Sequence, residues 1–141
     1  MPVAQRRRSI TIALSALALL WVVGCGGKKL YPVEGKVVFP DGTPLTGGWV
    51  EFEPLDAKGT VSAKGRIQTD GTFRLGTHGE DDGAIEGRYR ILVVPPLPPR
   101  LEERKAFKPV IAPRYQSFEK SGLEFTVTPG KNVCPIKVEK P

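Results

Sequence analysis

The sequence contains one histidine, His78, and only two cysteines, Cys25 and Cys134. This is a poor supply of nitrogen and sulfur ligands for a zinc site. No serine, cysteine or paired acid stands next to His78 in the way that a catalytic nucleophile and base would require. We therefore predict no catalytic residue, no metal site, no cofactor and no enzymatic activity. Cys134 alternates with outward positions in an apolar run, which predicts a buried, unreactive thiol.

Acidic residues are absent from residues 1–24. Arg6, Arg7 and Arg8 form a basic start, and a run of fourteen mostly apolar residues follows at 10–23. That length is typical of the hydrophobic region of a signal peptide, roughly 7–15 residues. It is short for a helix that crosses a bilayer, which needs about 20 residues. The sequence therefore predicts a signal peptide over residues 1–24.

The apolar run ends in Val22-Val23-Gly24-Cys25, which resembles the lipobox of bacterial lipoproteins. The resemblance implies that the thiol of Cys25 receives a diacylglycerol and that the chain is cleaved just before it. Two or three acyl chains hold a protein stably on a membrane, whereas one alone binds weakly. Residues 25–30 would then be the lipidated cysteine and its tether, on the periplasmic or outer-membrane face of the cell envelope. An uncleaved anchor, an ordinary secretory signal or a Cys25–Cys134 disulfide are the alternatives.

Once residues 1–24 are set aside, the charge is nearly balanced. Removing their three arginines from the 21 basic residues leaves 18, against 15 acidic residues, for a net charge of +3. Charges of both signs are interspersed, as on an ordinary soluble surface. The sequence has no basic stripe with interleaved aromatic residues, so we predict no nucleic-acid partner. The remaining length fits one domain, which we expect to be monomeric.

Long helices are not expected, because 16 glycines and 14 prolines interrupt the chain. The apolar residues between them alternate with period two, which indicates half-buried strands. Asp70-Gly71 and Pro129-Gly130 are turn signals. Pro135 indicates an edge strand or a strand start. The segment 100–107 is short and charged, so we expect a loop or a single helical turn. About seven strands are predicted, over residues 33–39, 48–54, 63–68, 72–75, 87–94, 123–127 and 133–138, and they favour an all-β, two-sheet sandwich.

Four ordered stretches carry a family resemblance: VEGKVVFPDGTPLTGGWVEFEP, TDGTFRLGT, DGAIEGRYRILVVPP and IAPRYQSFEKSGLEFTVTPGKNVCPIKV. Together they resemble the carboxypeptidase-regulatory-like domain, and more narrowly the small bacterial lipoproteins that carry it after a lipobox. The resemblance spans about residues 31–139 and assigns 31–141 to that domain. It implies a prealbumin-like or Ig-like β-sandwich without catalysis, serving as an envelope structural or protein-interaction module. One departure is the shortened turn at Thr69-Asp70-Gly71.

A binding surface is the alternative function. Trp49 and the arginines Arg74, Arg88 and Arg90 fall on outward positions, where an aromatic ring beside guanidinium groups would suit a carbohydrate or a peptide. The simpler interpretation is a charged solvent face with cross-strand ion pairs, each contributing about 0.2–1 kcal/mol. We expect the long segment 95–121 to cover Trp49.

The densest acidic cluster is Glu80-Asp81-Asp82. Calcium binds oxygen ligands of this kind, but it needs six to eight of them, and three consecutive carboxylates do not converge on one ion unaided. A solvated loop is the simpler interpretation, and the calcium alternative stays open at this point.

Overall fold

The computed structural model describes residues 26–56 and 61–141. Residues 1–24 and Cys25, where we expect the signal peptide and the lipidation site, lie outside the described residues. The strands and helices are β1 (Leu30–Tyr31), β2 (Val33–Val38), β3 (Trp49–Pro54), β4 (Ala63–Arg66), β5 (Thr72–Arg74), β6 (Ala84–Ile85), β7 (Gly87–Val94), α1 (Leu101–Arg104), a 3₁₀ helix η1 (Pro113–Gln116), β8 (Leu123–Val127) and β9 (Asn132–Lys137).

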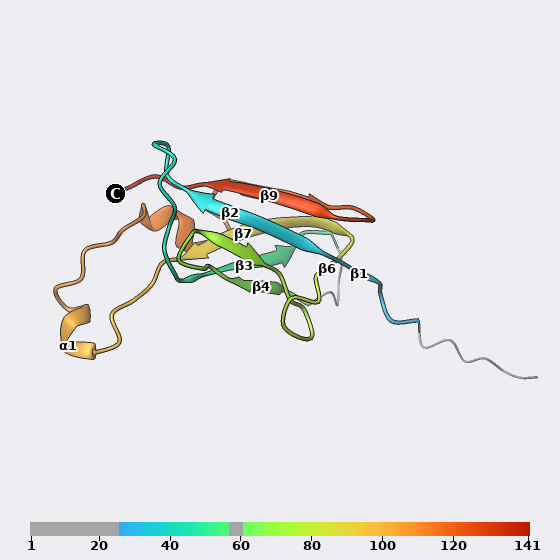
Figure 1. The fold of residues 1–141 in the computed structure, drawn as a ribbon, viewed down its shortest axis with the longest axis horizontal. Coiled ribbons are helices and arrows are strands. Elements are labelled where there is room, and N and C mark those ends of the chain that lie inside the picture. Colours follow the sequence, from blue (N-terminus) through green and yellow to red (C-terminus); the bar gives the residue numbers. More distant parts are fainter. Residues whose placement is uncertain (1–25, 57–60) are drawn as a thin grey trace, which may run out of the picture.

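The fold is an all-β sandwich, as predicted. One sheet has the order β4-β3-β7-β8 and the other β5-β2-β9. Figure 1 shows β2 and β9 in one layer, with β3, β4 and β7 in the layer facing it. All pairs are antiparallel except β2 with β9, which run parallel. Each of the seven predicted strands is present.

Two further short strands were not predicted. β1 and β6 form a separate antiparallel pair, in which Leu30 is opposite Ile85 and Tyr31 is opposite Ala84. Each has two residues, too few for an alternating pattern to appear in the sequence. β1 begins at Leu30, which is the last residue of the expected tether. The chain therefore pairs with β6 directly after the tether.

The core lies between the two sheets and consists of the residues that the alternation placed inward. Phe52 is at its centre, with ring centroids 6.1 Å from Phe73, 6.2 Å from Tyr89 and 6.3 Å from Phe125. Such tilted and edge-on pairs stabilise the core beyond the area they bury. Ile111 and Tyr115 are also buried, although they belong to the long segment 95–121. Part of that segment therefore packs against the core. The charged stretch within it forms α1, a single helical turn, which is one of the two outcomes expected there.

The predicted turn at Asp70 joins the two sheets. The Gln68 N–H donates to the Thr72 carbonyl at 2.8 Å, and Lys64 and Gly76 exchange two backbone hydrogen bonds of 2.9 and 2.8 Å. The two arms of this hairpin belong to different sheets, because β4 pairs with β3 while β5 pairs with β2. The turn thus closes one side of the sandwich.

β9 is an edge strand, and Pro135 faces its free edge. The N–H groups of Asn132 and Val138 donate to the carbonyls of Pro32 and Val38, both at 3.0 Å. In a parallel pair alternate residues bond to the same neighbour, so the nitrogen of Pro135 points away from β2. Its missing N–H therefore removes no bond from this pair, and it leaves a gap in the exposed edge.

The two ends of the sandwich differ. Residues 26–29 leave the body beside β1, whereas α1 and the C-terminal residues lie at the opposite end (Figure 1). An anchor at Cys25 would therefore act on the β1 end, and the segment around α1 would project away from it.

Candidate functional site

The tether before β1 is short. Four described residues, 26–29, separate Cys25 from Leu30, and all four are exposed. Five residues of extended chain span at most about 18 Å. Whatever holds Cys25 therefore holds the β1 end of the domain within about that distance. No helix in residues 26–56 or 61–141 is long and apolar enough to cross a membrane.

The four residues predicted as a binding surface do not come together. Arg88 and Arg90 lie on β7 in the four-stranded sheet, whereas Arg74 lies on β5 in the other sheet. Trp49 is opposite Val94, and Arg90 is opposite Glu53, so Trp49 and Arg90 are four residues apart along the strands. That offset is about 13 Å.

Trp49 is 44% exposed, so the expectation that segment 95–121 covers it is wrong. The segment leaves β7 past Gly48 instead. A Cβ at Gly48 would meet the backbone of Val94, Pro95 and Pro96, which shows how closely the two chains pass there. Because glycine permits this approach, the proline-rich chain runs beside the start of β3 and leaves the indole uncovered.

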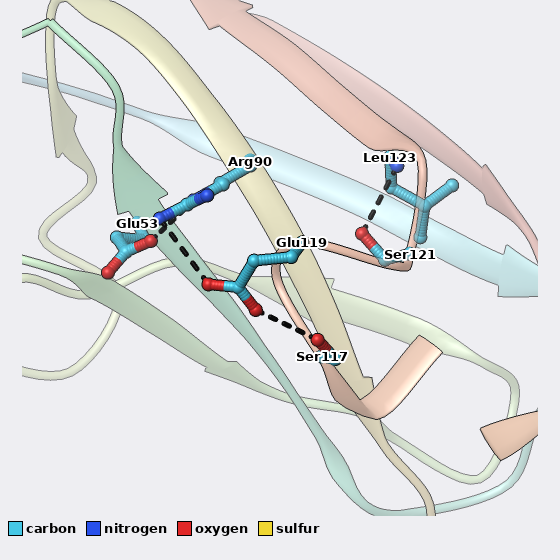
Figure 2. A network of polar contacts seen from close by, with 6 residues as sticks. All are labelled: Glu53, Arg90, Ser117, Glu119, Ser121 and Leu123. Carbon is cyan, nitrogen blue, oxygen red and sulfur yellow. Dashed lines mark hydrogen bonds and ion pairs between the residues drawn. The ribbon is translucent and has the colours of Figure 1, made fainter. Parts of the chain in front are cut away.

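Arg88 and Arg90 are engaged in ion pairs, as the simpler interpretation predicted. Figure 2 shows Arg90 between Glu53, at 2.6 Å, and Glu119, at 3.7 Å. The hydroxyl of Ser117 donates to Glu119 at 2.9 Å and positions that carboxylate. The guanidinium of Arg88 lies 3.9 Å from the carboxylates of both Asp56 and Glu124. These arginines therefore stabilise a charged solvent face.

A groove of about 600 Å³ lies on the outer face of the three-stranded sheet. Its cationic lining residues are Lys36 from β2, Arg66 from β4 and Arg74 from β5. More of the groove surface is apolar than polar. Its uncharged lining residues are Gly35, Gln68, Thr72, Phe73, Val133 and Pro135. This is the strongest candidate site among the described residues.

Arg66 and Arg74 line the groove from opposite arms of the hairpin at Asp70. The pairing of Lys64 with Gly76, and of Gln68 with Thr72, places residue 66 opposite residue 74. Like charges directly opposite each other destabilise a sheet. Neither arginine forms an ion pair within the described part of the chain, and neither does Lys36. Three cations that form no ion pair therefore line one groove, together with the acidic residues Glu34 and Asp81.

Two acidic residues also line the groove. Glu34 is opposite Arg74 in the sheet, but its carboxylate is 2.7 Å from the ammonium of Lys131. The hydrogen bond from Lys131 is the main reason that the pKa of Glu34 is lowered, with a smaller contribution from Arg74. The other acidic lining residue, Asp81, lies in the loop after β5.

Trp49 is next to this groove but does not line it. It is directly opposite Arg66 in the β3–β4 pair, so the two side chains project from the same face. Trp49, Arg66 and Arg74 thus form one row across three adjacent chain segments. The arginine opposite Trp49 is Arg66, which was not among the predicted binding residues, whereas Arg88 and Arg90 lie apart from the groove.

The acidic loop is held by Asp82. Its carboxylate accepts backbone N–H groups from Thr77 at 2.6 Å, His78 at 3.1 Å and Gly79 at 2.8 Å. These bonds, led by that from Thr77, lower the pKa of Asp82. The carboxylate is therefore used to order the loop. No group of three or more potential metal ligands occurs in the described ranges, and the side chain of His78 is exposed.

Cys134 is buried, as predicted, and only 2% exposed. Burial raises the pKa of its thiol to about 12. A thiol with so little thiolate is a poor nucleophile and metal ligand. Cys134 therefore acts as a small core residue.

A second hollow, of about 390 Å³, lies at the end that carries the C-terminus. It is mainly apolar, with Phe39, Leu45, Pro96 and Val110 among its lining residues. The ammonium of Lys140 lies 5.4 Å from the centre of the Phe39 ring and is the hollow's charged group.

Sequence reasoning missed both hollows. A signal for the first was present: Arg66 and Arg74 are equally spaced about Asp70, so a tight turn there brings them opposite each other. No protein-family model, no curated protein and no solved structure matches this chain.

Proposed function

We propose that this protein is a membrane-anchored bacterial lipoprotein whose β-sandwich is a non-catalytic structural or protein-interaction module of the cell envelope. The observation that carries the proposal is the position of Cys25. It follows a basic and then an apolar segment with the order of a lipoprotein signal, and it precedes β1 by only five residues. Acyl chains on its sulfur would hold the domain at the membrane surface.

The described part of the domain supports an interaction role. The one cysteine it contains is buried with a raised pKa, and its histidine side chain is exposed on a loop. With an anchor at Cys25, the β1 end would lie near the bilayer and the opposite end, which carries α1 (Figure 1), would face away from it.

Metabolic labelling with a radioactive fatty acid tests the anchor. We expect the label in the wild-type chain and its loss in Cys25→Ser, with accumulation of the uncleaved precursor. The matched control is Cys134→Ala, which removes the other cysteine and should leave labelling unchanged. Label that persists in Cys25→Ser, or a mature protein that retains residues 1–24, would contradict the proposal.

A second function, carbohydrate or peptide binding by the same domain, is favoured by the groove with Arg66 and Arg74. The exposed indole of Trp49 adjoins it. Screening the protein against an array of glycans and peptides tests this function. Binding that is weakened in Trp49→Ala would support it.

A further inference from the structure

We propose that the groove lined by Lys36, Arg66 and Arg74 binds an acidic glycan, whose carboxylates contact the three cations and whose sugar rings extend toward Trp49. This inference rests on the second function proposed above and names its class of ligand. It is independent of the lipid anchor.

The groove brings together three of the described cations that form no ion pair. Seven ion pairs occur among the described residues, and they engage Lys64, Arg88, Arg90, Arg114 and Lys131. The three cations of the groove have no such pair. A guanidinium binds a carboxylate through two parallel hydrogen bonds. A carboxylate held between Arg66 and Arg74 would therefore remove the repulsion between them.

Uncharged groups of the groove suit the hydroxyls of a sugar. Gln68 is exposed beside the two arginines, and its amide both donates and accepts hydrogen bonds. The hydroxyl of Thr72 donates to Asp70 at 2.6 Å, which leaves its lone pairs free to accept. A ligand that carries both carboxylates and hydroxyls matches these groups better than a simple anion.

Trp49 favours an extended ligand. The row from Trp49 through Arg66 to Arg74 crosses three adjacent chain segments, and strand spacing makes it about 10 Å long. The indole is 44% exposed at one end of the row. Its apolar face would pack on a sugar ring whose neighbour is bound by the arginines.

The edge of the sheet favours a glycan over a peptide. Peptides commonly bind to β proteins by adding a strand to a sheet edge through backbone hydrogen bonds. The free edge of β9, next to the groove, lacks an N–H at Pro135. The groove instead offers side chains on the face of the sheet, which recognise charged and hydroxyl groups.

The test measures the affinity of the mature, full lipoprotein in detergent micelles for oligogalacturonate, a chain of acidic sugars. Dextran is the neutral glycan control, and polyglutamate is the acidic peptide control. After residue 21, Trp49 is the only tryptophan in the sequence, so a change in its fluorescence reports binding. We expect oligogalacturonate to bind, with an affinity that falls as salt is raised.

Two double variants separate a specific site from general charge. Arg66→Gln with Arg74→Gln should weaken binding about tenfold or more, because charge-assisted hydrogen bonds are lost. Lys105→Gln with Lys108→Gln removes the same net charge from an exposed segment distant from the groove, and affinity should stay within about twofold. The arginine variant should melt no lower than the wild type, because it relieves like-charge repulsion.

Several outcomes would overturn the inference. An equal loss of affinity in the lysine variant would show non-specific attraction. Binding of polyglutamate at least as tight as oligogalacturonate would assign the groove to acidic peptides. Binding of dextran alone, weakened in Trp49→Ala when affinity is measured by titration calorimetry, would keep the second function and reject an acidic ligand. If none of the three probes binds, both the acidic-glycan inference and the second proposed function are rejected.

Discussion

Gly35 on β2 lies directly against the backbone of Cys134, its partner on β9. A Cβ at residue 35 would overlap the Cys134 carbonyl and would also lie 2.5 Å from the ring of Phe73. The absence of a side chain at this position therefore lets the parallel pair form while the Phe73 ring packs against it.

Gly35→Ala should lower the free energy of unfolding by about 2–3 kcal/mol, because the strand or the ring must move to make room. Denaturant unfolding followed by circular dichroism measures the change. Gly27→Ala is the matched control: a Cβ there meets nothing within 4 Å, and we expect a change within about 0.5 kcal/mol. Equal stability of the two variants would contradict the close contact.

Asp82→Asn should lower stability at neutral pH by about 1 kcal/mol, because its charge strengthens the hydrogen bonds to Thr77, His78 and Gly79. The pKa of Asp82 is lowered from its ordinary 3.8, chiefly by the bond from Thr77. The stabilisation is therefore complete above about pH 4, and it is lost as the pH falls through the folded-state pKa.

Unfolding curves measured from pH 7 down to pH 2 check the Asp82 prediction. The difference between the wild type and Asp82→Asn should shrink toward zero at the acid end. Asp81→Asn is the control, since its left-handed backbone conformation, with φ of 58°, also suits asparagine. A difference that stays constant with pH would show that the charge of Asp82 does not act on this loop.

Cys134 should resist thiol reagents in the folded protein and react once denaturant is added, because the thiol is buried. Its pKa is raised by burial from 9.0 to about 12. The unfolded thiol therefore ionises first, and stability is lost as the pH rises from about 9 toward 12. Cys134→Ala should lack this part of the pH dependence. Fast labelling of the native protein, or an identical alkaline slope in Cys134→Ala, would contradict the buried thiol.

Much of the sandwich was predictable because a strand exposes its two faces alternately. Val50 and Phe52 point inward while Glu51 and Glu53 point outward, and a period-two pattern records that directly. Strands of two residues are too short to show such a pattern in the sequence. β1 and β6 are held by pairing with each other, and two residues carry too little periodicity to reveal a strand.

The candidate site was predicted only in part. The outward direction of Arg74, Arg88 and Arg90 followed from alternation, but their grouping with Trp49 did not. Arg88 and Arg90 meet Glu124 and Glu53 on neighbouring strands. Which outward charges become neighbours depends on strand order, and strand order is a property of the assembled sheets.

The amino-acid sequence alone indicated seven of the strands between residues 33 and 138, which side of each is apolar, and where a cysteine follows a basic and then an apolar segment. These are local properties, because periodicity, turn chemistry and the resemblance to a lipobox each depend on residues close together in the chain. The tertiary structure decided that Arg66 and Arg74 line one groove outside the ion pairs of the described residues, and that Trp49 stays uncovered. Such relationships arise only when the turn at Asp70 carries the chain from one sheet to the other and sets distant strands side by side.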